Sequence, residues 1–170
     1  MTTREISLVH LALIAKLLLL LSIANGGPLI AKKVCGSRFS RPIDGGSVFL
    51  DGRPVFGASK TVRGALVSIA ATTVTAPLLG LEATVGAAIA SSAMAGDLFS
   101  SFVKRRLNLR PGSRATGLDQ IPESLLPLLA CLGWLPLTLS DILVGVTAFF
   151  LGEIYLSRML YRLRIRDRPY

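Results

Sequence analysis

Apolar residues gather into long runs along the chain, and polar residues are concentrated between these runs. The runs cover residues 6–30, 64–81, 83–103, 121–139 and 142–161. Each is long enough to cross about 30 Å of hydrocarbon as a helix, because an α-helix rises about 1.5 Å per residue. The pattern therefore predicts an all-α integral membrane protein with about five transmembrane helices, in a single domain over residues 1–170.

Two of these segments contain residues that complicate the prediction. Lys16 lies midway along the first segment, so it must reach the membrane surface, pair with an acid or face the bundle interior. A signal peptide over residues 4–25 is the alternative, but Lys16 splits its apolar run, which favours an uncleaved helix. The fourth segment contains Pro122, Pro127 and Pro136, which lack a backbone N–H donor, so it could be bent or re-entrant rather than fully spanning.

Composition agrees with a membrane protein. The chain is 51% hydrophobic and 17% charged, whereas soluble domains carry about a quarter charged residues. Cys35 lies in a polar stretch and Cys131 in an apolar one, so no disulfide is expected. The third segment also carries small residues at four-residue spacing, which favours close helix packing: Gly86 and Ala90, Ala87 and Ser91, Ser92 and Gly96.

Basic residues predict the orientation of the bundle. The net charge is +9, and seventeen of the nineteen Lys and Arg residues lie in residues 32–63, 104–120 and 158–170. A serpentine of five helices puts these regions on one face, which the positive-inside rule assigns to the cytoplasm. The N-terminus is then outside, the C-terminus is cytoplasmic and the long basic loops are cytoplasmic. Orientation and attraction to anionic headgroups explain the basic tail: Arg158, Arg162, Arg164, Arg166 and Arg168.

Asp97 is an acid well inside the third apolar segment. A carboxylate at that depth is costly unless a cation or a polar cavity receives it. Hydroxyl and cationic residues follow on the same helix face: Ser100, Ser101, Lys104 and Arg105. The alternative is a purely structural salt bridge, with Lys16 as the partner; Glu153 in the fifth segment could equally pair with that lysine.

A second acid, Asp119, follows a Gly- and Arg-rich loop over residues 106–117, which can fold it back against the end of the third helix. Two carboxylates held together repel one another unless a divalent cation bridges them. Oxygen ligands without nearby His or Cys favour Mg²⁺, and the only histidine, His10, lies near the outer end of the first helix, where a structural role is expected. We therefore expect Asp97 and Asp119 to bind Mg²⁺.

A second basic cluster precedes the second apolar segment. Ser59 or Thr61 can cap that helix, which leaves Lys60 and Arg63 at its N-terminus. The helix dipole disfavours cations there, so a bound anion such as phosphate is indicated; positive-inside bias is the alternative explanation. Acids and cations at the boundary between cytoplasm and lipid suit phosphoryl or nucleotidyl transfer to a lipid.

The residues from Gly96 through Arg105 and on to Asp119 resemble the signature of the CDP-diglyceride synthetase superfamily of membrane cytidylyltransferases. That signature has a serine, two residues, Lys-Arg, a basic loop and a later aspartate; Ser101, Lys104 and Arg105 occupy its first positions. The usual His-Gly-Gly is replaced by residues 114–117, and Gln120 stands where arginine is usual. These departures, the small size and the Lys60–Gly64 box resemble the archaeal branch, the CDP-archaeol synthases.

The resemblance covers about residues 25–165 and implies a reaction. CTP and 2,3-di-O-geranylgeranylglyceryl phosphate would give CDP-archaeol and pyrophosphate with Mg²⁺, in a multi-pass cell-membrane protein whose active site faces the cytoplasm. CTP, the lipid phosphate and membrane lipids are then the expected partners, and no nucleic acid is expected. Sequence leaves the oligomeric state open.

The chemistry of this reaction predicts roles for individual residues. Asp97 and Asp119 would bind Mg²⁺, and Lys104 and Arg105 would neutralise the phosphates. The remaining candidates would bind nucleotide or lipid phosphate: Lys60, Thr61 and Arg63 at the second helix, and Ser101, which would orient a phosphate oxygen. Asn25 either contacts the nucleotide or caps backbone near residues 26–28. Asp44 and Asp51, each before a glycine, are interpreted as turn residues.

Two alternative functions fit parts of the sequence. A small ion-coupled transporter or structural membrane protein would use a buried Asp97 without nucleotide, but it would be expected to show repeated halves, which the sequence lacks. A CDP-alcohol phosphatidyltransferase needs a DGxxAR motif, and residues 51–56 break that pattern.

Overall fold

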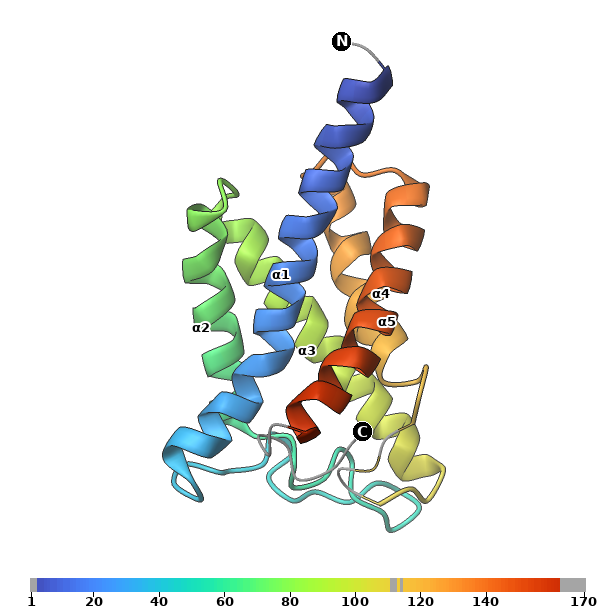
Figure 1. Cartoon of the computed structure of the whole chain (residues 1–170). Coiled ribbons are helices and arrows are strands. Elements are labelled where there is room, and N and C mark those ends of the chain that lie inside the picture. Colours follow the sequence, from blue (N-terminus) through green and yellow to red (C-terminus); the bar gives the residue numbers. More distant parts are fainter. Residues whose placement is uncertain (1–2, 111–112, 114, 163–170) are drawn as a thin grey trace.

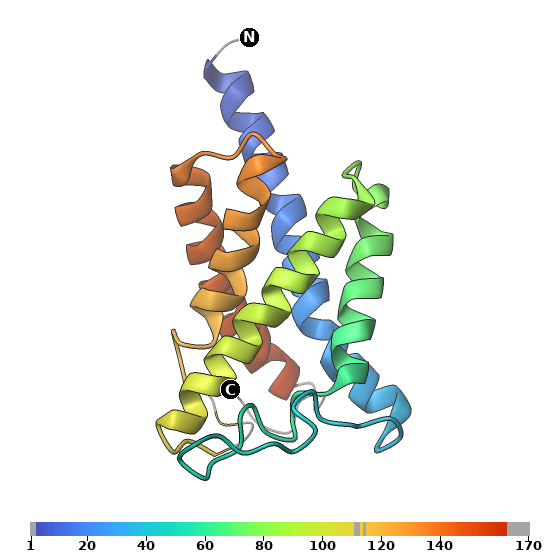
Figure 2. The same ribbon diagram turned by 180° about the vertical axis from the view of Figure 1, so that it is seen from behind.

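The computed structural model describes residues 3–110, 113 and 115–162, and all regular elements within them are helical. These are α1 (Thr3–Cys35), α2 (Val62–Leu78), α3 (Ala83–Arg106), α4 (Gln120–Ala130), the short 3₁₀ helix η1 (Cys131–Gly133) and α5 (Leu139–Arg162). Figures 1 and 2 show the α-helices packed into one bundle, with the N-terminal end of α1 projecting beyond it. The all-α prediction is confirmed for this part of the chain. Among the described residues, two stretches are long and apolar enough to cross a membrane, His10–Cys35 and Leu139–Met159.

The first helix is an integral part of the bundle core. Leu17, Leu20, Leu21 and Ala24 of α1 are almost fully buried. They pack into one cluster with aliphatic residues of α3 and with Phe149 of α5. A helix that supplies this much of the core stabilises the folded bundle, which favours the uncleaved helix over a signal peptide.

Lys16 reaches the end of the bundle instead of pairing inside it. Its Nζ lies 3.8 Å from the position that a side-chain Cβ would take at Gly80, in the turn between α2 and α3. The alternative in which Lys16 neutralises Asp97 or Glu153 is therefore wrong. At the same end, His10 Nδ1 lies 2.6 Å from Asp141 Oδ2, which ties α1 to the start of α5 and confirms a structural role for the histidine.

Small residues let α3 approach its neighbours closely. A Cβ at Gly86 would lie 2.6 Å from the carbonyl oxygen of Thr72 in α2. A Cβ at Gly96 would lie 2.5 Å from the carbonyl carbon of Pro122 and 2.8 Å from the amide nitrogen of Glu123 in α4. Both glycines are thus required by backbone packing, as the small-residue pattern predicts.

The predicted helix over residues 121–139 is wrong in its second half. α4 ends at Ala130 after 11 residues, which is about 16 Å of helix and about half of the hydrocarbon thickness. One 3₁₀ turn follows, and the chain is irregular until α5 begins at Leu139. Pro136 explains why no helix continues to Leu139, because a proline disfavours the helical conformation at the residue before it, which is Leu135.

The long connections meet at one end of the bundle. The loop over residues 36–61 and the described part of residues 107–119 lie at the end where α5 finishes, opposite the turns at residues 79–82 and 134–138 (Figure 1). Within the first loop, the side chain of Asp44 accepts a hydrogen bond from Gly46 N (3.0 Å), and that of Asp51 accepts one from Arg53 N (3.1 Å). The interpretation of both aspartates as turn residues is confirmed. The basic tail over residues 163–170 lies outside the described residues.

Candidate functional site

The site is built on one face of the second half of α3. Asp97 is followed on this face by four buried polar residues: Ser100, Ser101, Lys104 and Arg105. Their spacing of three, four, seven and eight residues places them along one side of the helix. The side chain of Asp97 is only 17% exposed, so its charge requires a partner, as the sequence indicates.

Lys60 is that partner. Its Nζ lies 2.5 Å from Oδ1 and 2.5 Å from Oδ2 of Asp97. The backbone fixes Lys60 in place, because its carbonyl oxygen accepts a hydrogen bond from Ile43 N at 2.8 Å. Thr61 then caps α2, with its Oγ1 accepting a hydrogen bond from Gly64 N at 3.2 Å. The negative group expected beside Lys60 is thus supplied by the chain itself in this structure.

Lys104 and Asp119 form a second ion pair. Lys104 Nζ lies 2.6 Å from Asp119 Oδ1 and donates a hydrogen bond to the carbonyl oxygen of Ser113 at 3.1 Å. Asp119 Oδ2 accepts a hydrogen bond from Ala115 N at 2.9 Å. The loop therefore folds Asp119 back against the end of α3, as its short Gly-rich sequence predicts.

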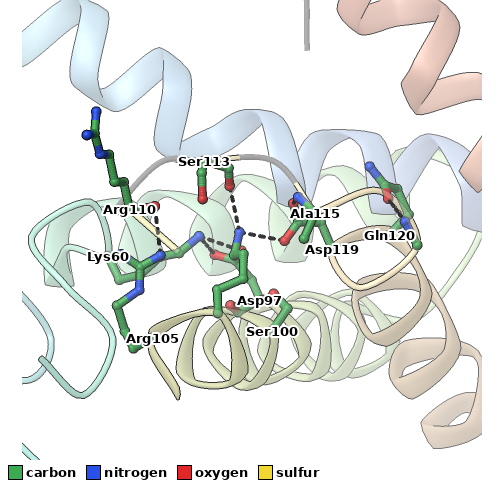
Figure 3. A network of polar contacts seen from close by, with 11 residues as sticks. Lys60, Asp97, Ser100, Arg105, Arg110, Ser113, Ala115, Asp119 and Gln120 are labelled. Atoms are coloured by element: carbon green, nitrogen blue, oxygen red, sulfur yellow. Dashed lines mark hydrogen bonds and ion pairs between the residues drawn. The ribbon is translucent and has the colours of Figure 1, made fainter. Parts of the chain in front are cut away.

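The two pairs belong to one cluster. The charge of Lys104 also acts on Asp97, so this lysine interacts with both aspartates. Figure 3 shows Lys60, Asp97 and Asp119 gathered beside the end of α3, with Ser113 and Ala115 close to them. Two acids that lie 22 positions apart in the sequence thus meet at the end of the bundle where the basic loops lie.

Glu123 is a third acid of this cluster, and the sequence reasoning missed it. It is buried, with a relative exposure of 7%, and its side chain interacts with Asp97. Gly96 makes this approach possible, because α4 rests on the backbone of α3 at that residue. An acid between two prolines of an apolar helix was the available signal, since an ionisable residue in such a segment is itself a candidate for function.

The remaining arginines differ in their freedom to bind an anion. Arg105 is 3% exposed and donates from Nη2 to the carbonyl oxygen of Arg110 at 2.9 Å. Its Nε and Nη1 are buried without a hydrogen-bond partner among the described residues. Arg63 instead donates to the carbonyl oxygens of Gly36 (3.2 Å) and Arg38, so it binds the chain after α1.

Asn25 lies apart from the charged cluster. α1 continues unbroken to Cys35, so the expectation that Asn25 caps backbone near residues 26–28 is wrong. Its side chain lines a cavity between α1 and α5. Contact between Asn25 and a nucleotide stays a prediction.

The cluster fits a hard divalent cation in donor type. Asp97, Asp119 and Glu123 offer carboxylate oxygens, which Mg²⁺ prefers over the nitrogen and sulfur ligands favoured by zinc. Each aspartate is held by a lysine nitrogen at 2.5–2.6 Å, so a cation and a lysine would compete for the same oxygens. Within the described residues, no group of three or more His, Cys, Asp or Glu side chains is arranged as a metal site.

The described part of the chain is thus a helical bundle with two membrane-length apolar stretches, and it carries buried acid–lysine pairs beside its basic loops. The chain belongs to the CarS-like family, CDP-archaeol synthase, whose family model matches residues 82–170. This membership agrees with the resemblance read from residues 96–119, and it does not favour the transporter or phosphatidyltransferase alternatives.

Individual relatives agree with this assignment. The chain is 38% identical over 79 residues to a CDP-archaeol synthase of Sulfurisphaera tokodaii, covering 46% of this chain and 48% of that protein. It is 58% identical over 36 residues to a CDP-archaeol synthase of Pyrococcus furiosus, covering 21% of this chain and 22% of that protein. The alignments therefore span about half, or less, of these curated relatives.

A solved structure, described as an intramembrane enzyme for archaeal membrane lipid biosynthesis, has the same fold. It superposes with a TM-score of 0.68 at 32% sequence identity and covers 81% of this chain and 90% of its own. The bundle is thus that of a membrane protein.

Proposed function

We propose that this chain is a CTP-dependent cytidylyltransferase that activates 2,3-di-O-geranylgeranylglyceryl phosphate to CDP-archaeol with release of pyrophosphate. One observation supports the proposal above all: Asp97 and Asp119 converge with Lys60 and Lys104 in one cluster, in a chain of the CDP-archaeol synthase family. Acids beside cations at a bundle end are what a metal–nucleotide substrate requires.

The reaction is a displacement at phosphorus. An oxygen of the lipid phosphate attacks the α-phosphorus of CTP, the bond from that phosphorus to the bridging oxygen breaks, and pyrophosphate leaves. Lys104 and Arg105 neutralise the charge that develops on the leaving pyrophosphate, and Ser101 orients a phosphate oxygen. Bound at Asp97 and Asp119, Mg²⁺ would supply further charge neutralisation on the phosphates.

Charge balance explains why acids and lysines are interleaved. Without substrate, each lysine neutralises one carboxylate, so the cluster carries no large buried net charge. Arrival of a nucleotide with its cation gives the ammonium groups phosphate oxygens and gives the carboxylates a cation. Lys60, Thr61 and Arg63, at the start of α2, contact nucleotide or lipid phosphate in this arrangement.

The same proposal includes the membrane topology. All five α-helices lie in the membrane with the N-terminus outside and the basic loops cytoplasmic, so the active site faces the cytoplasm. α4 crosses only part of the bilayer, and it is covered by α3 and α5. Membrane lipids contact the basic tail.

The direct test is a product assay. Membranes or purified protein with CTP, Mg²⁺ and the lipid phosphate should release pyrophosphate and form a CDP-lipid in equal amounts. Folded wild-type protein that stays inactive with several lipid phosphates would refute the proposal. Ion flux without any dependence on nucleotide would favour the transporter, and transfer from a CDP-lipid to an alcohol would favour the phosphatidyltransferase.

A further inference from the structure

Residues 47–55, in the loop between α1 and α2, form a small hairpin whose tip is apolar and exposed. Val48 is 65% exposed, Phe49 is 41% exposed and Leu50 is 97% exposed. These are three consecutive apolar residues outside the hydrophobic core, and the proposed function gives none of them a role. A run of this kind on a folded surface indicates a contact with something outside the chain.

Backbone hydrogen bonds hold this tip in one shape. At the turn, Gly52 N donates to the carbonyl oxygen of Phe49 at 2.9 Å, and Phe49 N donates to that of Arg53 at 2.7 Å. Behind the turn, Val55 N donates to the carbonyl oxygen of Ser47 at 3.1 Å. Gly52 has a φ of 74°, which glycine adopts without strain. The apolar side chains are therefore presented outward by an ordered segment.

The hairpin is attached to the C-terminal end of α3. The ring of Phe49 packs edge-on against that of Phe102, with 5.3 Å between their centroids. Arg53 Nη1 donates to the carbonyl oxygen of Arg106 at 2.7 Å. In Figures 1 and 2 the teal segment that contains the hairpin lies beside the lower end of α3. The depth of that helix end therefore determines the depth of the tip.

The length of α3 places this end at the level of the lipid headgroups. α3 has 24 residues and is therefore about 36 Å long, whereas the hydrocarbon is about 30 Å thick. Figure 2 shows α3 running obliquely across the bundle, which brings its two ends close to the two hydrocarbon boundaries. With the topology proposed above, the tip lies at the boundary of the cytoplasmic leaflet.

The charges around the tip suit a membrane surface. The acid of the turn, Asp51, is neutralised by Arg106, whose Nη1 lies 2.6 Å from its Oδ1. Arg53 adds a second cation to the hairpin. Apolar side chains flanked by cations are typical of segments that lie in the headgroup region, because anionic headgroups attract the cations.

The size of the patch favours lipid over a protein partner. A stable protein interface removes about 800 Å² from each partner, which is far more than the side chains of one hairpin tip provide. Insertion into the headgroup region needs no such area, because each apolar side chain that leaves water contributes separately.

We propose that Val48 and Leu50 insert into the headgroup region of the cytoplasmic leaflet, so that the bilayer holds the loop that carries Lys60. The inference rests on the membrane topology included in the proposed function, but it does not depend on the chemistry. The tip keeps the loop at the depth at which Lys60 meets Asp97.

Fluorescence of a tryptophan at the tip tests the insertion. Trp134 is the only tryptophan of the chain, so Leu50→Trp in the Trp134→Phe background gives a single reporter. In nanodiscs of anionic phospholipid brominated near the carbonyl ends of its chains, its emission should be at least about twofold weaker than in unbrominated nanodiscs, because bromine quenches on contact and the tip is inserted. Ala58→Trp, at an exposed position of the same loop, is the matched control and should lose little emission.

A second variant shows whether apolar insertion causes the quenching. Val48→Asp, added to the Leu50→Trp reporter, should reduce the quenching to that of Ala58→Trp, because a carboxylate resists transfer out of water and is repelled by anionic headgroups. Val48→Trp gives the same readout if Leu50→Trp does not fold.

Three results would overturn the inference. Quenching at position 50 or 48 no stronger than at position 58 would show that the tip stays in water. Quenching that persists with Val48→Asp would show that insertion is not driven by the apolar tip. Emission that ignores bromine but changes with protein concentration in detergent would assign the tip to a contact with a second copy. None of these measurements uses turnover, so an inactive enzyme would refute the proposed chemistry without deciding this question.

Discussion

At the scale of single residues, the central feature is two buried ion pairs, each formed by one lysine and one aspartate. Lys60 with Asp97 and Lys104 with Asp119 are mostly removed from solvent. A buried pair adds little net stability compared with apolar residues, because desolvation offsets the attraction between the charges. Pairs of this kind in an otherwise apolar bundle are therefore better explained by function than by stability.

Replacing either aspartate by its amide should stop turnover. Asp97→Asn and Asp119→Asn keep the shape of the side chain but remove the negative charge that would hold a cation. We expect kcat to fall at least about 100-fold, because such charge neutralisation contributes several kcal/mol and each 1.4 kcal/mol is about tenfold in rate. Product formation in detergent-solubilised protein of unchanged elution volume measures this. Arg166→Ala and Arg168→Ala are the controls and should keep near wild-type rates; an aspartate variant that does the same would contradict the assignment.

Asp44 should hold the loop over residues 36–61 in shape. Partial burial raises the pKa of this carboxyl, but hydrogen bonds from three backbone amides outweigh it and leave the pKa below its ordinary value. A lowered folded-state pKa means that the contribution to stability is present at neutral pH and is lost as the pH falls below about 4.

The variant Asp44→Asn tests whether this carboxylate holds the loop in shape. One carboxylate oxygen accepts from Gly46 N, and the other accepts from Phe56 N and Gly57 N. An asparagine has a single acceptor oxygen, so it loses one of these sets. Amide hydrogen exchange at residues 56–57 should accelerate by a factor of about 5–30 at pH 7. Exchange that is unchanged would show that the carboxylate does not organise the loop.

At the scale of elements, the contact between α3 and α4 determines where two of the three acids lie. Gly96→Ala should disturb it. Alanine favours a helix over glycine by about 1 kcal/mol, but its Cβ would lie 2.5–2.8 Å from backbone atoms of Pro122 and Glu123, and backbone cannot rotate away as a side chain can. We therefore expect a net loss of about 1–3 kcal/mol and weaker binding of Mg²⁺ with CTP. Thermal unfolding measures the loss of stability. The control is Gly133→Ala, whose Cβ would have no atom within 4 Å. Equal melting temperatures for the two variants would contradict the prediction.

A second element contact attaches the first loop to the end of α3 through Arg106. Its Nη1 lies 2.6 Å from Asp51 Oδ1, and its Nη2 donates to the carbonyl oxygen of Pro54 at 2.6 Å. The guanidinium also stacks on the rings of Phe49 and Phe102, at 4.8 and 5.0 Å from their centroids. The loop that carries Lys60 is thus fastened to the helix that carries Asp97.

Arg106→Ala should release this loop. Cleavage by a protease at residues 45–52 should become faster by a factor of about 5–30, because several charge-assisted contacts are lost together. The KM for CTP should rise as Lys60 loses its fixed position. Lys33→Ala, an exposed residue at the end of α1, is the control. Proteolysis that stays at the wild-type rate would mean that the loop is held by other contacts.

Element boundaries could be predicted only where local chemistry decides them. Thr61 before an apolar run correctly marks the start of α2, since its side chain caps the helix. The end of α4 at Ala130 was not predicted, because the apolar residues continue to Leu139 and the prolines of this segment indicated only that it could be bent or not fully spanning. Hydrophobicity reports which residues avoid water, and it does not report whether their backbone can be helical.

At the scale of the whole molecule, the positions of the basic residues predicted more of the chain's arrangement than the periodicity of its hydrophobic residues did. Counting basic residues put the loops over 32–63 and 104–120 on one face, and the structure brings their described parts to the same end (Figure 2). This follows from the antiparallel order of the helices, because each helix moves the chain to the other end of the bundle. The partner of Asp97 was not predictable in this way. Lys60 is 37 positions away, and only the packing of α2 on α3 together with the Arg106 contacts brings it there.

The central claim is that the cluster of Asp97, Asp119, Lys60 and Lys104 is the site for CTP with its cation. Amide hydrogen exchange of the purified protein, with and without CTP and Mg²⁺, tests it most directly. The account predicts slower exchange in residues 51–64 and 97–119 only when CTP and Mg²⁺ are both present, and loss of this protection in Asp97→Asn. Folded wild-type protein that shows no protection in either region, or protection only at the opposite end of the bundle, would contradict it.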